Sequence, residues 1–142
     1  LKVCAELRTA FVAFSPLGRG MLTGLAPDPA SFSNGDFRRT IPRFQEPQFS
    51  QNRAALDAYT ALCAQLGHTP ASVAIAWILA AGNHLIAIPG TRTAEHLEAN
   101  VAAISLRLTD AQRRDISAVF PPDFPWGERF NANHSIGVEP SA

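Results

Sequence analysis

The chain has 142 residues, of which 46% are hydrophobic and 17% charged, and its 12 basic and 12 acidic residues cancel. This composition predicts a folded domain rather than a disordered chain. The balanced charge argues against a nucleic-acid surface or a polybasic membrane contact. The longest apolar stretch, Ala71 to Ala81, is far shorter than the roughly 20 residues that span a bilayer. We therefore expect a cytoplasmic protein with no nucleic-acid or membrane partner.

The chain opens inside a helical pattern. Leu1, Cys4 and Leu7 follow the period of an amphipathic helix, and no capping residue precedes them. We therefore expect this chain to be the C-terminal part of a larger protein. The two cysteines, Cys4 and Cys63, lack the spacing of a metal or redox motif and are predicted to be buried free thiols.

A first strand and a glycine-rich loop follow. Ala10 to Phe14 is a short apolar run, and the segment Ser15-Pro16-Leu17-Gly18-Arg19-Gly20-Met21-Leu22-Thr23-Gly24 comes directly after it. From Leu25 to Pro47, prolines are expected to break any regular element, while Phe32, Phe37 and Phe44 indicate that the segment packs onto something. Its arginines favour a flap over a cofactor; the alternative is a surface excursion with solvated arginines. These arginines are Arg38, Arg39 and Arg43.

Two helices are predicted next. The first begins at a Ser50 cap and runs to about Leu66, with Gly67 as its stop. Its apolar stripe is Ala55, Tyr59, Leu62, Cys63 and Leu66. The second has Thr69 as N-cap and Pro70 at its first position, and it ends before Gly82. Its stripe is Val73, Ala74, Trp77, Ile78 and Ala81.

A second strand, Leu85 to Ile88, stops at Pro89-Gly90 and leads through Thr91-Arg92 into a helix over 94–102. The free backbone N–H groups of a helix start favour a phosphate, and a guanidinium suits phosphate oxygens. The segment therefore predicts an anion site. The alternative is an ordinary helix start capped by Thr93, with Arg92 in solvent.

The order strand, helix, strand predicts a parallel crossover. A capping box at Thr109 to Gln112 then predicts a last helix that ends near Phe120, before two prolines. Residues 121–142 show no period and are expected to be an irregular tail. Parallel strands are normally covered on both faces, so their apolar side chains should remain partly uncovered here: Phe11, Val12, Phe14, Leu85, Ile86 and Ile88.

Taken together, these motifs resemble the aldo-keto reductase family. Its penultimate strand runs into a loop like Ser15 to Gly20, and its last strand runs into a loop like Ile88-Pro89-Gly90-Thr91-Arg92. The resemblance covers nearly all of the chain and fades in the final twenty or so residues. It implies an α/β fold, the C-terminal part of a (β/α)8 TIM barrel, in which two parallel strands are flanked by helices and helix predominates. The whole of residues 1–142 would then be a segment of one barrel domain.

The resemblance also implies NADPH-dependent reduction of aldehydes or ketones. In the family, a tyrosine donates the proton and is tuned by a lysine, with an aspartate and a histidine nearby, all on earlier strands. None of the four has a match here, because Lys2 lies in the first helix and Tyr59 lies in the stripe of a long helix. We therefore assign no catalytic residue to this chain.

The resemblance assigns the cofactor end to this chain, with Gly90, Thr91 and Arg92 on the 2′-phosphate. His96 matches a family arginine or glutamine, although it can also be read as a surface histidine. Asn100 matches an adenine-facing asparagine, while Ala99 replaces the glutamate common before it, which removes one adenine contact. The pyrophosphate and ribose would lie along the first loop: Ser15, Leu17, Gly18, Arg19 and Gly20.

Two other interpretations stay open at this point. One is a noncatalytic truncated module that keeps dinucleotide or phosphate affinity or acts as a helical interaction partner. The other is an unrelated α/β domain with a phosphate site. The expected partners are a small carbonyl substrate and either the remainder of the barrel or a second copy of the chain. The sequence does not identify the substrate.

Overall fold

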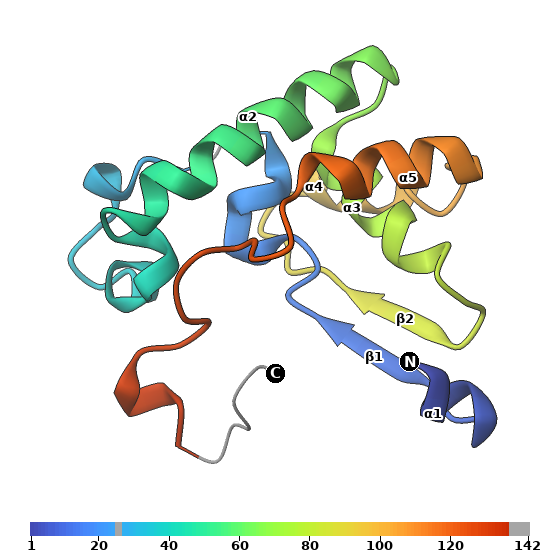
Figure 1. The fold of residues 1–142 in the computed structure, drawn as a ribbon, viewed down its shortest axis with the longest axis horizontal. Coiled ribbons are helices and arrows are strands. Elements are labelled where there is room, and N and C mark those ends of the chain that lie inside the picture. Colours follow the sequence, from blue (N-terminus) through green and yellow to red (C-terminus); the bar gives the residue numbers. More distant parts are fainter. Residues whose placement is uncertain (25–26, 137–142) are drawn as a thin grey trace.

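The computed structural model describes residues 1–24 and 27–136. Two strands, β1 (Phe11–Phe14) and β2 (Leu85–Ile88), pair in parallel, with Phe11 opposite Leu85 and Phe14 opposite Ile88 (Figure 1). Both predicted strands and their parallel arrangement are confirmed. The α-helices of the described residues are α1 (Lys2–Glu6), α2 (Gln48–Gln65), α3 (Pro70–Leu79), α4 (Ala94–Ala102) and α5 (Asp110–Val119).

The helix starts follow local capping rules, with one exception. Thr69 caps α3 with Pro70 at the first position, and Thr109 and Gln112 form the predicted capping box of α5. The expected Ser50 cap is wrong: α2 begins at Gln48, and the Ser50 amide instead donates to the Glu46 carboxylate at 3.3 Å. A charged acceptor four residues earlier therefore replaces the hydroxyl cap.

Length and hydropathy bear on whether the helices could span a membrane. Among residues 1–24 and 27–136, no single helix is both long and apolar enough to cross one. α2 and α3 pass that test only as a pair bent by 88°, and only by length and composition.

The proline-rich segment is more regular than expected. The flap, defined here as residues 27–47, contains three short 3-10 helices, Pro29–Ser31, Phe37–Thr40 and Pro42–Phe44. Asp28 and Asp36 cap the first two by accepting from Ala30 N and Arg38 N, each at 2.9 Å. The prolines therefore start turns rather than breaking all structure. Residues 25–26 of the predicted loop lie outside the described residues.

The core consists of two clusters. Phe32 and Phe44 of the flap pack in the first, as predicted, whereas Phe37 is 40% exposed. The second joins α2, α3 and α5 through Tyr59, Cys63, Val73, Ala74 and Ile116. Both cysteines are free thiols, Cys63 buried and Cys4 half-buried.

The apolar stripe predicted for α3 is wrong at its C-terminal end. Trp77 and Ala81 are exposed, and the helix ends at Leu79, three residues before Gly82. The buried positions are instead consecutive, from Ser72 to Ala76. α3 contacts α2, α4 and β2, so its N-terminal half is covered on several sides and shows no single stripe.

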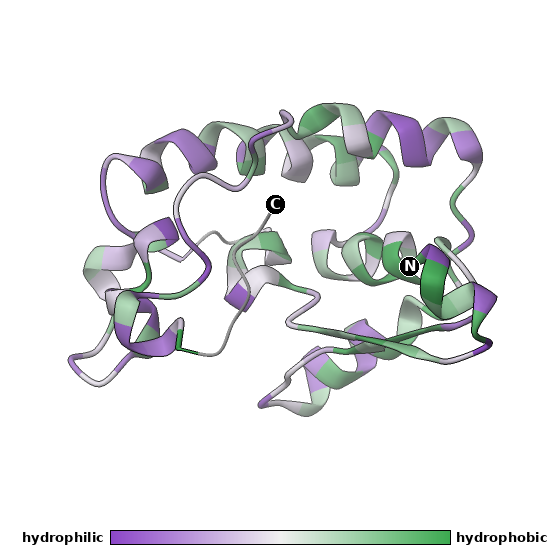
Figure 2. Ribbon diagram, turned by 60° about the horizontal axis from the view of Figure 1, so that its bottom comes forward, coloured by the Kyte–Doolittle hydropathy of each residue, from purple (hydrophilic) through white to green (hydrophobic). Residues whose placement is uncertain are grey.

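The two faces of the sheet differ in their coverage. Val12, Phe14, Ile86 and Ile88 share one face by the strand register, and each is 50–52% exposed. Figure 2 shows the two strands mainly in the green of hydrophobic residues. Leu85 lies on the other face, toward α3, and is buried, so the expectation that it would stay uncovered is wrong. One apolar face of the sheet therefore has no covering layer in the described residues.

The segment after α5 folds back along the molecule (Figure 1). Residues 121–136, called the tail here, contain one 3-10 helix, Ala132–His134, and no α-helix or strand. Phe124 packs against the first core cluster. The remainder of the predicted irregular segment, 137–142, lies outside the described residues.

Candidate functional site

The candidate site lies at the carboxyl edge of the sheet. Because β1 and β2 are parallel, the segments that follow them begin at the same edge. We call residues 15–24 the β1 loop and residues 89–93 the β2 loop. The predicted site residues lie in these two loops and in α4, which follows the β2 loop directly.

The β1 loop has an unusual backbone. Gly18 and Gly20 have φ of +58° and +99°, a region that glycine enters without steric cost. Ser15 and Arg19 also have positive φ, at 50° and 58°. Such non-glycine residues cost free energy and cluster at functional sites. Leu17 anchors the loop by packing on the second core cluster.

A cavity of about 170 Å³ opens beside this loop. Ser15, Gly18 and Arg19 line it together with Arg43 of the flap and Phe124 of the tail. Gly20 lies against the flap, since a Cβ there would stand 3.4 Å from the Arg38 guanidinium. The structure thus brings the predicted β1-loop residues together with two segments far away in the sequence.

Arg19 is held by the tail and the flap. Its Nη1 donates to the carbonyl of Arg129 at 3.2 Å, and its guanidinium lies 4.8 Å from the ring centre of Phe130. Burial, and then the charge of Arg129, lower the pKa of Arg19. Arg38 Nη1 donates to the Arg19 carbonyl at 3.4 Å. The arginine is therefore fixed in place although it makes no ion pair in the described residues.

The β2 loop is much more open. Thr93 caps α4 by accepting from His96 N at 3.2 Å, and the Thr91 hydroxyl donates to the Thr93 carbonyl at 3.1 Å. Gly90, Thr91, Arg92 and His96 are all exposed. A Cβ at Gly90 would meet no atom within 4 Å. The helix start therefore presents free backbone donors beside an exposed guanidinium, which is the arrangement that suits an anion.

Asn100 behaves differently from its neighbours on α4. It is 7% exposed, and its Nδ2 has no hydrogen-bond partner among the described residues. A buried unpaired amide costs about 1–3 kcal/mol, so such a group calls for an explanation. An acceptor on a bound ligand would satisfy it. Ala99 contributes only its carbonyl, which accepts from Ser72 Oγ at 2.9 Å and ties α4 to α3.

Arg38 of the flap holds Asp36 as a carboxylate. Hydrogen bonds from the Arg38 side chain and backbone lower the pKa of Asp36 to about 2, and the charge of Arg92 contributes least. Arg38 also donates to the Arg19 carbonyl, so the flap contacts the β1 loop.

Comparisons with known proteins show the family of the chain. The model of the aldo/keto reductase family matches residues 1–120. The chain is 37% identical over 116 residues to the aldo-keto reductase yakc [NADP(+)] of Schizosaccharomyces pombe, a match that covers 82% of this chain and 34% of that protein. It is 42% identical over 112 residues to the aldo-keto reductase str7 of Strobilurus tenacellus, covering 79% and 33%. The chain belongs to the aldo-keto reductase family.

Solved structures show the fold of this aldo-keto reductase chain. The glycerol dehydrogenase AKR11B4 of Gluconobacter oxydans superimposes with a TM-score of 0.77 at 26% identity, over 88% of this chain and 38% of that one. The thermostable aldo-keto reductase Tm1743, solved with epalrestat, gives 0.52 at 20% identity, over 84% and 32%. The chain spans about a third of the length of these relatives. It therefore has the fold of part of a TIM barrel, as predicted.

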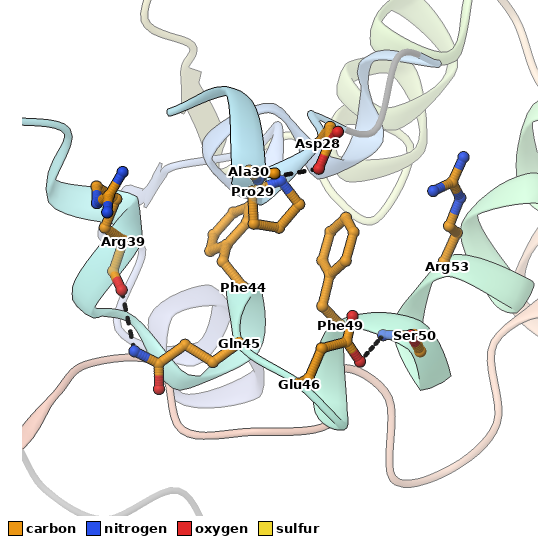
Figure 3. Close-up of a pocket in the computed structure, with 10 residues that line it drawn as sticks. All are labelled: Asp28, Pro29, Ala30, Arg39, Phe44, Gln45, Glu46, Phe49, Ser50 and Arg53. Atoms are coloured by element: carbon orange, nitrogen blue, oxygen red, sulfur yellow. Dashed lines mark hydrogen bonds between the residues drawn. The ribbon is translucent and has the colours of Figure 1, made fainter. Parts of the chain in front are cut away.

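A larger cavity of about 480 Å³ lies elsewhere in this reductase chain, between the flap and the start of α2 (Figure 3). None of the predicted cofactor residues lines it. Several of its polar groups are already bonded within the chain: Asp28 accepts from Ala30 N, Glu46 accepts from Ser50 N, and Arg39 donates to the Phe32 carbonyl. Size alone therefore does not make it the candidate site.

Sequence reasoning missed the tail as a part of this site. The tail brings Phe124, Arg129 and Phe130 to the β1 loop and the flap. Its aromatic and charged composition, Phe124-Pro-Trp-Gly-Glu-Arg-Phe130, was a signal that this segment packs. Tyr59 is buried as predicted, with its hydroxyl donating to the Pro70 carbonyl at 2.7 Å. Within the described part of the chain, no His, Cys, Asp and Glu group could hold a metal ion.

Proposed function

We propose that the protein is a cytoplasmic NADP(H)-dependent aldo-keto reductase that reduces aldehydes or ketones to alcohols, and that this chain supplies its cofactor-binding part. The observation that carries the proposal is the cavity shared by the β1 loop and the flap, together with the β2 loop and α4, which follow the parallel partner strand from the same edge of the sheet. The Schizosaccharomyces pombe relative is named for NADP(+), which supports the choice of cofactor.

The residues fit a dinucleotide in a definite order. Gly90, Thr91 and Arg92 would hold the 2′-phosphate, with His96 one turn further on and the buried Asn100 Nδ2 free to donate to adenine. The pyrophosphate and ribose would lie on the β1 loop, on Ser15, Leu17, Gly18, Arg19 and Gly20. When bound, the nicotinamide supplies a hydride for the carbonyl carbon. The chain's own residues bind and orient the cofactor, and the flap excludes water from it.

We assign no proton donor to this chain. Burial raises the pKa of Tyr59, and its hydroxyl is occupied by the Pro70 carbonyl. A tyrosine that holds its proton this firmly cannot serve as a general acid near neutral pH. We therefore expect residues 1–142 alone to be inactive toward carbonyl compounds, and the activity to require the complete polypeptide that contains them.

The test of the cofactor assignment is Arg92→Ala in that complete polypeptide. NADPH binding should weaken by about 1.5–3 kcal/mol, the scale of a hydrogen bond to a charged group, while NADH binding should change little. Arg114→Ala on the exposed surface of α5 removes the same charge and serves as the control. Titration calorimetry with both cofactors measures the difference, and equal losses for NADPH and NADH would contradict the assignment of Arg92.

The uncovered apolar face of the sheet indicates that another part of the protein packs against it. Val12, Phe14, Ile86 and Ile88 expose about half of their surface, and an open apolar sheet face or edge invites pairing. We propose that the remaining strands of the barrel cover it, because the chain superimposes on only 38% of the glycerol dehydrogenase. Without them, self-association is expected, and light scattering of residues 1–142 would detect it. A stable monomer of residues 1–142 that reduces aldehydes would contradict both the expected self-association and the expected inactivity.

A noncatalytic module with dinucleotide affinity is the second candidate. It is favoured because the motifs of this chain match the cofactor-binding residues of the family, whereas the four catalytic residues of the family have no match here. NADPH oxidation by the complete polypeptide, tested with a panel of aldehydes, distinguishes the two candidates. Cofactor binding without turnover would support the module and contradict the reductase.

A further inference from the structure

Arginines from three separate segments meet beside the β1 loop. Arg19 belongs to that loop, Arg43 to the flap and Arg129 to the tail. Arg19 Nη1 donates to the Arg129 carbonyl at 3.2 Å, and Arg43 Nε donates to the Gly127 carbonyl at 2.9 Å. Arg19 and Arg43 both line the 170 Å³ cavity. Two arginines therefore line this cavity, and a third, Arg129, is bonded to one of them through its carbonyl.

The charge of these arginines is not neutralised within the described part of the chain. None of the three arginines forms an ion pair within the described residues. Burial, followed by repulsion from Arg129 and Arg19, lowers the pKa of Arg43, and Glu128 opposes this only in part. Like charges brought together while losing water cost free energy. The bonds to carbonyl groups do not require a full charge, since a neutral donor could make them.

Several donors of this cluster remain available. Among the described residues, the Nη atoms of Arg43 and the whole guanidinium of Arg129 make no hydrogen bond. The Arg129 guanidinium lies 5.1 Å from the ring centre of Phe14, the last residue of β1. Its charge therefore lies at the carboxyl edge of the sheet, where the candidate cofactor site is.

We propose that Arg19, Arg43 and Arg129 together form a binding site for an oxyanion, to which the flap contributes Arg43 and the tail contributes Arg129. The planar guanidinium group can donate two parallel hydrogen bonds to a pair of oxygens on a phosphate or a carboxylate. The identity of the anion rests on the proposed reductase function, which brings two oxyanions to this edge: the pyrophosphate of the dinucleotide or an acidic group on the carbonyl substrate.

The bound anion would also fix the tail. Its negative charge would attract all three arginines and offset their mutual repulsion. Because the arginines belong to the β1 loop, the flap and the tail, the anion would hold these three segments together. The tail is already anchored at Trp126, whose backbone bonds to Asn52 at 2.8 and 2.9 Å. Arg129, three residues further on, would therefore reach the anion from a fixed base.

The test uses Arg129→Gln and Arg43→Gln in the complete polypeptide, with Arg114→Gln as the control for charge. Arg129→Gln is the primary variant, because the residue is exposed and its backbone carbonyl can still accept from Arg19. Calorimetry measures the binding of two ligands. ADP-ribose has a pyrophosphate but no 2′-phosphate, and 2′-AMP has a 2′-phosphate but no pyrophosphate. Steady-state kinetics compares benzaldehyde with para-carboxybenzaldehyde, which carries an added carboxylate.

If the anion is the pyrophosphate, each variant should weaken ADP-ribose binding about tenfold, the scale of one charged hydrogen bond, and leave 2′-AMP binding unchanged. If the anion belongs to the substrate, ADP-ribose binding should be unchanged, and KM should rise about tenfold for the carboxylated aldehyde alone. Either result supports the oxyanion site and identifies its occupant.

If neither variant changes either measurement while the unaltered protein binds NADPH, the oxyanion site is wrong and the proposed function stands. If the unaltered protein binds neither NADPH nor ADP-ribose, the proposed function itself is wrong. Arg43→Gln also removes the bond to Gly127 and can loosen the tail, so a loss seen only in that variant and also in 2′-AMP binding counts against the site. The two failures are therefore distinguishable.

Discussion

The two loops at the carboxyl edge of the sheet are built in opposite ways. The β1 loop is enclosed by contacts from the flap and the tail, which hold Arg19 through Arg38 and Arg129. Among the residues that the structure describes, the side-chain hydrogen bonds of the β2 loop are the Thr91 bond and the Thr93 cap, and Arg92 is exposed. A substitution around the first loop should therefore affect folding and binding together, whereas a substitution in the second should affect mainly binding.

The difference follows from what each loop is expected to bind. A helix start needs little support, because its backbone donors are already aligned by the helix itself. The β1 loop has instead an irregular 3-10 helix, Gly18–Thr23, and keeps several residues at positive φ. That backbone persists only where the surroundings hold it. The flap and the tail supply these surroundings, and this dependence can be tested by loosening them.

Asn52→Ala should give the largest effect. The side chain is fully buried and bonds to both backbone groups of Trp126 and, at 3.3 Å, to the Arg43 carbonyl. Its loss leaves buried backbone groups without partners, so unfolding should become easier by about 3 kcal/mol. Urea denaturation of the complete polypeptide measures this value. An unchanged midpoint would mean that the tail does not support the β1 loop.

Gly127→Ala should give a somewhat smaller loss by a different cause. Gly127 has φ +90°, and a Cβ there would stand 2.9 Å from Arg43 N and 3.0 Å from Pro42 C. Backbone atoms cannot move aside cheaply, so we expect a loss of about 2 kcal/mol and faster protease cleavage of the tail. Gly35→Ala is the matched control, since its Cβ would meet no atom within 4 Å. Equal stability of the two variants would contradict the tight packing of the tail on the flap.

Most local signals were sufficient, and the Ser50 cap is the exception. Both strands, the caps Thr69, Thr93 and Thr109, and the two loops after the strands follow from neighbouring residues. The tail could not be predicted in this way. Its main anchor joins Asn52 to Trp126 across 74 positions, and an asparagine inside a helix carries no sign of such a partner.

The error on α3 also comes from distant segments. Trp77 fits the period of α3 but lies where no neighbouring element covers it, while Ile75 and Ala76 are buried because several elements surround the start of that helix. Periodicity assumes one covered face, and contacts made by distant segments change that assumption. The candidate site shows the same division: its glycines and Thr93 were predicted, but the approach of Arg129 was not.

Thr93→Ala tests the more open loop. Loss of the cap should destabilise α4 by about 1 kcal/mol, as should Thr109→Ala at the start of α5. Only Thr93→Ala should also weaken NADPH binding, because its helix start is the proposed phosphate site. Thermal unfolding and calorimetry on both variants measure the two effects. If Thr109→Ala weakened NADPH binding as much, the effect would be a general loss of stability and not a local one.

The smallest expected effect concerns Asp36 of the flap, which forms an ion pair with Arg38. Hydrogen bonds from Arg38 lower the pKa of Asp36 from 3.8 to about 2. A lowered pKa in the folded state means that the charged carboxylate stabilises the fold above pH 4, and that this contribution is lost as the pH falls toward 2. Asp36→Asn keeps an acceptor for Arg38 N, but it removes the charge and one of the two oxygens that accept from the Arg38 guanidinium. The urea midpoint of the unaltered protein should therefore exceed that of the variant slightly at pH 6, and the difference should shrink between pH 4 and pH 2. Because the carboxylate is partly exposed, salt should reduce the difference at pH 6 as well. A difference independent of pH would show that Asp36 supports the flap as a hydrogen-bond acceptor alone, and the expected contribution of its charge to stability would be wrong.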